Sequence, residues 1–194
     1  NGEAVPLVLA LHGSGDQMNL QANRVAEAWA DPENQEVRKA FVLAPIFYDQ
    51  STEAAFDICK DTINLIRRLI DKGMVDPKRV YVTGKSMGGR NTGRIFSSYD
   101  GMFAAAMPLC GGYSDELKDK IENIRNKPIW ILQGDQDKPA LLEGSRELYA
   151  KLQELGNEQA KYYEFPVEVM DEAGIGYHDI EILAMEDPQF MEWM

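Results

Sequence analysis

Short apolar runs alternate with longer amphipathic stretches along the whole chain. Six runs rich in β-branched or aromatic residues predict strands at residues 6–11, 40–44, 79–83, 103–109, 128–132 and 161–165. Strands that alternate with helices predict a mostly parallel sheet with helices on both faces, because each parallel strand needs a crossover connection. The predicted fold class is therefore a three-layer α/β/α sandwich with a sheet of about six strands.

Three stretches between the strands have helical character. Residues 56–72 carry isoleucines and leucines mostly on one helical face, and Gly73 is predicted to end that helix. Residues 145–155 form a second amphipathic stretch, which Gly156 closes, and residues 90–98 are compatible with a third helix. Asp76-Pro77 predicts a turn before the third strand, and residues 31–39 and 170–177 are predicted to be rich in loops.

Length and composition indicate one globular domain over residues 1–194. The chain is 44% hydrophobic and 27% charged, and its formal net charge is −12. That charge argues against a phosphate-backbone binder and disfavours anionic membranes. No apolar run approaches the roughly 20 residues that cross a bilayer. The two cysteines, Cys59 and Cys110, lie in apolar surroundings, which favours buried free thiols over a disulfide.

The most informative stretch is VYVTGKSMGG at residues 80–89. A predicted strand runs directly into G-x-S-x-G and a helix-compatible segment follows, which is the context of a nucleophilic serine on a sharp strand-to-helix turn. Ser86 is the predicted nucleophile, and the backbone N–H of Met87 is predicted to face the oxyanion. A phosphate-binding loop is the alternative for Gly84-Lys85-Ser86, but Arg79 stands where that motif needs a glycine.

A second oxyanion donor is predicted after the first strand, in His12-Gly13-Ser14-Gly15. The loop after this strand supplies an N–H in enzymes of this architecture, and the amide of Ser14 is the predicted donor. His12 is one of only two histidines. We interpret it as a residue that braces the loop, the alternative being a general base.

The predicted acid and base follow later strands. Asp137 follows the fifth predicted strand in G-x-x-D, with Asp135 as its rival, and His178 comes last in GIGYHD. The order Ser86, Asp137, His178 is the triad order that goes with the G-x-S-x-G turn. Two histidines and two cysteines far apart lack zinc-ligand spacing, so no metal and no cofactor are predicted.

With these residues in place, the chain resembles the α/β-hydrolase esterases related to polyhydroxybutyrate depolymerases and feruloyl esterases, often labelled predicted peptidases. The resemblance runs through LALHGSGD, VDPKRVYVTGKSMGG, FAAAMPLCGG, KPIWILQGDQD and the tail from GYHD onward. It implies the triad Ser86, Asp137 and His178. It also implies a sheet that lacks the first two strands of the full fold, and it favours a secreted or periplasmic location because such relatives are often exported.

Four positions depart from that family's pattern. Lys85 replaces a usual hydrophobic residue and Arg90 a common aromatic one, Tyr177 is an extra residue before the histidine, and the segment 45–55 is short. Lys85 and Arg90 bring positive charge near the nucleophile. They are interpreted either as solvated charges or as groups that favour esters carrying a carboxylate.

The predicted function is a serine carboxylesterase that works through an acyl-enzyme. The absence of a long insertion predicts an open cleft, suited to small esters or to acetyl or feruloyl esters on plant polysaccharide. A serine peptidase on the same fold and an inactive binding module are the alternatives. No nucleic-acid or membrane partner is expected, and the oligomeric state is left open.

Overall fold

All six strands that the described residues form run parallel in one sheet, in the order β2-β1-β3-β4-β5-β6. The structure is a computed structural model that describes residues 3–14, 23–46 and 52–194, with side chains from residue 59 onward in the last range. The strands are β1 (Val5–Leu11), β2 (Phe41–Leu43), β3 (Val75–Lys85), β4 (Ala105–Leu109), β5 (Ile129–Gly134) and β6 (Ala160–Phe165). Each coincides with a predicted strand, and the predicted fold class is confirmed.

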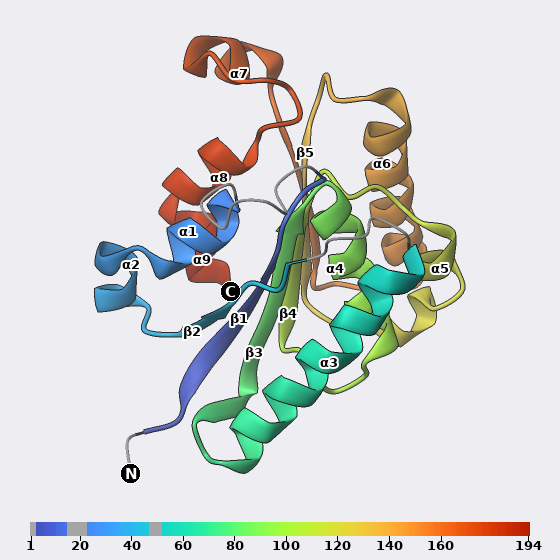
Figure 1. Ribbon diagram of the computed structural model, residues 1–194. Helices are drawn as coiled ribbons and strands as arrows, with labels where there is room; N and C mark the ends of the chain where they lie inside the picture. The colour runs from blue at the N-terminus through green and yellow to red at the C-terminus, as the bar shows by residue number, and fades with distance from the viewer. Residues whose placement is uncertain (1–2, 15–22, 47–51) are drawn as a thin grey trace.

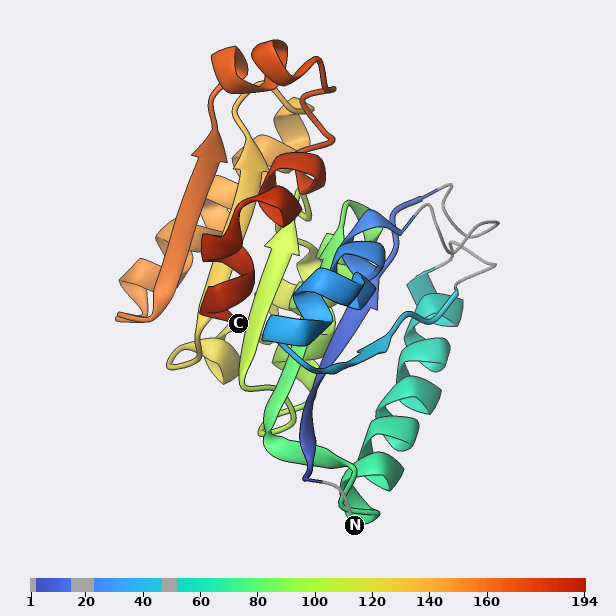
Figure 2. The ribbon, with the colours of Figure 1, turned by 90° about the vertical axis from the view of Figure 1, so that its left-hand side faces the viewer.

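Helices cover both faces of the sheet (Figures 1 and 2). One face carries α3 (Thr52–Asp71), α4 (Met87–Ser98) and α6 (Pro139–Glu154). The other carries α1 (Arg24–Ala30), α8 (Glu181–Glu186) and α9 (Pro188–Trp193). The remaining helices are α2 (Pro32–Val37), α5 (Asp115–Lys118), the 3-10 helix η3 (Ile121–Ile124) and α7 (Val167–Ala173). No helix in the described ranges has the length and apolar character to span a bilayer.

The buried core follows the alternation of side chains along the strands. In β1, Leu7, Leu9 and Leu11 join the core beneath α3, α4 and α6. Val8 and Ala10 point to the opposite face and pack in the core with the helices of the other layer. Because successive side chains of a strand point to opposite faces, a strand apolar at every position must be covered on both sides.

Two segments predicted to be loop-rich contain helices instead. Residues 31–39 include α2, where the Asp31 carboxylate accepts from the Glu33 N–H and Pro32 occupies the first turn. Residues 170–177 include the end of α7, closed by Gly174 at φ 67°. None of the α2 side chains is buried. Without an apolar face, this helix left no periodic signal in the sequence.

The turn predicted at Asp76-Pro77 lies within β3 as an irregularity of the strand. Val5 pairs with Val75 but Leu7 pairs with Val80, so the β3 chain bulges between these pairs. The Asp76 carboxylate holds the bulge by accepting from the Lys78 N–H at 2.9 Å and from Arg79 Nε at 2.7 Å. Residues 47–51 of the predicted short segment 45–55, and Gly15 of the predicted oxyanion turn, lie outside the described residues.

The start of α4 lies directly against the end of β1. A Cβ added at Gly88 would come within 2.1 Å of the Leu11 carbonyl oxygen, and one at Gly84 within 2.6 Å of the same atom. Both contacts are with backbone, which cannot rotate away. The G-x-S-x-G glycines are therefore required by the close approach of helix and strand.

Gly88→Ala is expected to lower the free energy of unfolding by roughly 2 kcal/mol or more, because overpacking here must displace backbone. Urea denaturation measures the change. Gly156→Asn is the control, since Gly156 has φ 75° with no atom near its Cβ position and asparagine tolerates this conformation. Equal stability of the two variants would contradict this account of the helix–strand contact.

Candidate active site

Ser86 stands at the turn from β3 to α4 in a conformation that non-glycine residues rarely adopt, with φ 58° and ψ −116°. Its N–H donates to the Leu109 carbonyl at 2.8 Å, and its own carbonyl accepts from the Arg90 N–H at 2.9 Å. The neighbouring strand and the first turn of α4 thus fix the backbone on both sides. A strained backbone conformation persists only where the surrounding contacts enforce it, and such conformations are frequent at functional sites.

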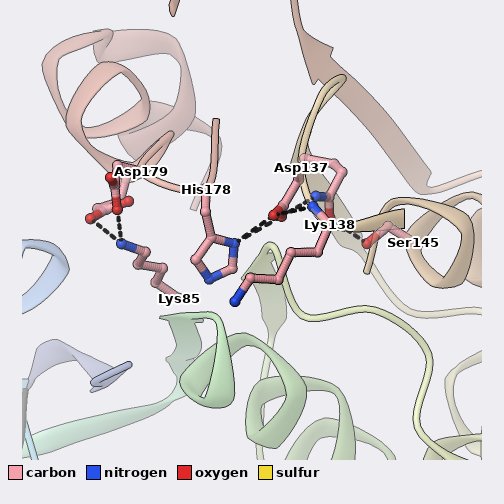
Figure 3. Close-up of polar contacts among 8 residues, drawn as sticks. Lys85, Asp137, Lys138, Ser145, His178 and Asp179 are labelled. Carbon is pink, nitrogen blue, oxygen red and sulfur yellow. Dashed lines mark hydrogen bonds and ion pairs between the residues drawn. The ribbon is translucent and has the colours of Figure 1, made fainter. Parts of the chain in front are cut away.

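Asp137 and His178 are in direct contact, although 41 residues separate them (Figure 3). His178 Nδ1 lies 2.8 Å from Asp137 Oδ2 and 3.0 Å from Oδ1. Asp137 follows β5, and His178 lies in the loop between α7 and α8. The Asp137 side chain is fully buried, whereas that of His178 is 25% exposed. The geometry is that of a carboxylate which orients an accessible imidazole.

Two further donors hold the Asp137 carboxylate, and Ser145 holds one of them in place. The Lys138 N–H donates to Oδ1 and Gln133 Nε2 donates to Oδ2, both at 2.6 Å. The Ser145 hydroxyl donates in turn to Gln133 Oε1 at 2.8 Å. Burial raises the pKa of Asp137, but the hydrogen bonds from His178, Lys138 and Gln133 outweigh it and leave the pKa below its usual value.

Gln133 and Ser145 were missed from the sequence, although both are fully buried. The only signal for Gln133 is its place, a polar residue at the end of the apolar run PIWILQG. Ser145 gave no such signal, because serine is common on helix surfaces.

The loop that carries His178 rests on the end of β5. A Cβ at Gly134 would meet the Tyr177 carbonyl oxygen at 2.1 Å, so glycine is needed for this contact. Within the loop, the Asp179 N–H donates to the Gly176 carbonyl at 2.8 Å. Tyr177, the extra residue relative to the family pattern, thus contributes the backbone that touches β5.

Lys85 does not extend freely toward a substrate. Its ammonium lies 2.5 Å from Asp179 Oδ1 and 2.8 Å from Glu181 Oε1 (Figure 3). Burial alone would lower the pKa of Lys85, but the hydrogen bonds to these carboxylates raise it above its ordinary value. The interpretation of Lys85 as a solvated surface charge is therefore wrong, because its ammonium is largely buried and paired with two carboxylates.

Ser86, Asp137 and His178 all lie at the carboxyl edge of the sheet. Among the described residues, no hydrogen bond joins the Ser86 hydroxyl to the His178 ring. Such bonds are often long in ligand-free enzymes and tighten with substrate. The structure thus joins the predicted acid and base directly and brings the predicted nucleophile to the same edge.

The rival residues take other places. His12 is buried, and its Nδ1 lies 2.7 Å from the Gly13 carbonyl oxygen, in keeping with a residue that braces this loop. The Asp135 N–H donates to the Phe165 carbonyl at 3.1 Å, and no bond links the Asp135 carboxylate to His178 in the described part of the chain. Met87 begins α4, and Ser14 is exposed just before the residues outside the described range.

Cys110 lies beneath the Asp137–His178 pair. Its sulfur, an Asp137 oxygen and a His178 ring nitrogen are all within 4.8 Å of one another, a grouping that could hold a metal ion. The sequence argument from spacing missed it, because folding alone brings these residues together. Burial, with the charge of Asp137 second, raises the pKa of the Cys110 thiol well above its usual value. A thiol is a poor metal ligand until it is deprotonated. We therefore interpret Cys110 as a buried residue that packs against Asp137 and not as a metal ligand.

A pocket of about 360 Å³ opens one helical turn from Ser86. It lies between the start of α4, the segment that follows β4 and the start of α6. Arg90 contributes a cation to its wall, and Asp115 and Glu116 contribute carboxylates. The other residues of the wall are Gly111, Gly112, Tyr113, Ser114, Ala140 and Leu141. The wall of this pocket combines polar and apolar groups, and Ser86, Asp137 and His178 do not line it.

A strand-to-helix turn with a strained serine, next to an aspartate–histidine pair at the edge of a parallel sheet, defines an α/β-hydrolase. Residues 4–161 match the model of an alpha/beta hydrolase domain family, and the chain belongs to that family. The resemblance drawn from the sequence motifs is confirmed at this level.

Two of the similar proteins are esterases by name. A crystal structure of a thermostable esterase superposes with a TM-score of 0.85 at 33% identity, covering 98% of this chain and 54% of that one. Feruloyl esterase B of Piromyces equi is 34% identical over 85 residues, which are 43% of this chain and 16% of the relative. The chain thus spans about half of the first protein and a small part of the second.

A more distant structure has the same fold. Est1E from Butyrivibrio proteoclasticus gives a TM-score of 0.63 at 17% identity, covering 96% of this chain and 86% of that chain.

Both thiols are expected to be unreactive toward Ellman's reagent in the folded protein and to react fully after unfolding in guanidinium. Cys59 and Cys110 are 2% and 0% exposed, and burial raises both thiol pKa values, that of Cys59 to about 12. Colour development at 412 nm measures the reaction. A native thiol that reacts within seconds would contradict the burial of Cys110 beneath the site.

Proposed function

We propose that the chain is a serine carboxylesterase, with Ser86 as nucleophile, His178 as general base and Asp137 as the acid that orients it. The observation that carries the proposal is the His178–Asp137 hydrogen bond at the sheet edge where Ser86 stands in its strained turn. The esterases among the relatives support the same reaction class. The arrangement matches the roles that acyl transfer to water requires.

The proposed reaction has two steps. Ser86 Oγ attacks the ester carbonyl carbon while His178 takes its proton, and the tetrahedral oxyanion accepts hydrogen bonds from the Met87 and Ser14 amides. The alkoxide leaves with the proton from His178, and an acyl-enzyme remains. A water molecule, deprotonated by His178, then attacks the acyl carbon, and Ser86 leaves with the proton. Asp137 keeps the Nδ1 proton in place and stabilises the imidazolium throughout.

For the substrate, we propose acetyl or feruloyl esters on plant polysaccharide. The similarity to feruloyl esterase B supports this choice. The pocket beside Ser86 supports it as well, since Tyr113 and Leu141 offer apolar contacts to an acyl group. Arg90 is exposed in the same wall, where it can meet a carboxylate carried by such a polymer.

Ser86→Ala is expected to lower the hydrolysis of p-nitrophenyl acetate by roughly 10³-fold or more and to abolish labelling by a fluorophosphonate probe. His178→Ala should cost about as much, and the double variant little more, because the triad acts as a unit. Ser98→Ala, at the far end of the same helix, is the matched control. Should His178→Ala keep most of the rate while His12→Ala loses it, the base has been assigned to the wrong histidine.

Asp137→Asn is expected to lower kcat by roughly 10²–10⁴-fold, because an amide at this position can hold the wrong tautomer of His178. Asp135→Asn should change kcat by less than about threefold, since its carboxylate does not bond to the histidine. Steady-state kinetics on feruloyl and acetyl esters measure both variants. A larger loss in Asp135→Asn would move the acid to that residue.

A further inference from the structure

Lys85, Asp179 and Glu181 form a cluster of one cation and two carboxylates, which we call the Lys85 cluster. Lys85 is the last residue of β3 and directly precedes Ser86. Asp179 directly follows His178, and Glu181 begins α8. The cluster therefore joins the chain neighbour of the proposed nucleophile to the chain neighbour of the proposed base (Figure 3).

This cluster differs from an ordinary surface ion pair in its burial. The side chains of Lys85 and Glu181 are 16% and 6% exposed, and that of Asp179 is 44% exposed. Glu181 Oε2 is buried and has no hydrogen-bond partner within the described ranges, so Lys85 supplies the main compensation for this carboxylate. Loss of the cation would leave the buried Glu181 carboxylate uncompensated and would strongly destabilise the folded protein. We therefore expect the ion pair to persist.

The two sides of His178 are held by different elements. On the β5 side, Asp137 bonds to Nδ1 and the Tyr177 carbonyl lies against Gly134. On the β3 side, no hydrogen bond ties His178 to Ser86 in the part of the chain that the structure describes. The Lys85 cluster is the contact that links this loop to the nucleophile turn.

The chain passes any movement of the cluster on to the site. Consecutive Cα atoms are about 3.8 Å apart, so a backbone shift at Asp179 carries His178 with it. Misplacement of reacting groups by about 1 Å can cost roughly 10²-fold in rate. The backbone of Ser86 is fixed on the β4 side by its bond to Leu109, which leaves the His178 loop as the part that needs positioning.

We propose that Lys85 is a positioning residue, which holds the His178 loop beside the Ser86 turn through its contacts with Asp179 and Glu181. The inference rests on the proposed ester hydrolysis and adds a residue outside the triad. Lys85 touches neither substrate nor the reacting atoms in this role. It acts on kcat through geometry.

The experiment compares the steady-state kinetics of Lys85→Met and Lys85→Arg with those of the wild-type chain on p-nitrophenyl acetate. Lys85→Met is expected to lower kcat by about tenfold or more with KM changed less than about threefold. Lys85→Arg keeps the charge and should restore most of kcat. A Lys85→Met variant with wild-type kcat, or one whose whole loss lies in KM, would overturn the proposal.

Loss of stability is separated from loss of position by two further variants. Glu181→Gln, added to Lys85→Met, removes the uncompensated buried charge, so Tm should recover while kcat stays low. Lys127→Met is the matched control, because its side chain is 18% exposed and lies 2.7 Å from Asp100. Lys127 precedes β5 at the opposite edge of the sheet, and its variant should keep wild-type kcat. If kcat recovers together with Tm in the double variant, Lys85 only stabilises the fold and the positioning proposal is wrong.

Proton NMR tests the same proposal in the absence of any ester, through the Nδ1 proton of His178. The chain has two histidines, so a His12→Gln reference assigns the downfield Nδ1 proton that His178 shares with Asp137. In Lys85→Met this signal should broaden and exchange faster with water, and an unchanged signal would contradict the proposal. If the wild-type chain hydrolyses no ester, the proposed function is refuted. If the signal is nevertheless lost in Lys85→Met, the role of Lys85 in positioning His178 stands.

Discussion

The reversal of the chain at Ser86 depends on how closely backbone can approach backbone around it. Gly84 and Gly88 lie against the Leu11 carbonyl of β1, and Gly89 lies against the Leu109 carbonyl of β4. Only strands on both sides of β3 can supply these contacts, so the nucleophile turn needs the central position of β3 in the sheet. The strain at Ser86, of order 1–3 kcal/mol for such a conformation, is offset by the burial that this close packing brings.

The proposed acid and base depend on the next strands of the same sheet. Asp137 emerges where β5 ends, and the His178 loop reaches it because Gly134 lets the Tyr177 carbonyl come close. Cys110 directly follows β4 with φ 50°, and its sulfur lies within 4.8 Å of an oxygen of Asp137 and a ring nitrogen of His178. Three adjacent parallel strands thus deliver their carboxyl ends to one edge, which is where open α/β sheets bind ligands.

Much of this arrangement could be predicted from the sequence, because its signals are local. The apolar runs gave all six strands, and G-x-S-x-G and G-x-x-D gave the places of Ser86 and Asp137 in the fold. The partners of Lys85 could not be predicted, since they lie 94 and 96 residues away and no local pattern fixes the direction of a lysine side chain. Short helices such as α2 escaped for the opposite reason, having too few buried residues to produce a period.

The placement of charge around His178 reconciles two demands on a base. The ring must be accessible to substrate, and its carboxylate partner must be shielded from water so that their hydrogen bond stays strong. The structure meets both by burying Asp137 completely and leaving His178 a quarter exposed. In a chain with a net charge of −12, Asp179 and Glu181 add two more carboxylates, directly after His178 and at the start of α8. Lys85 pairs with both carboxylates. The same ion pairs that compensate their charge therefore connect the His178 loop to the end of β3, next to Ser86.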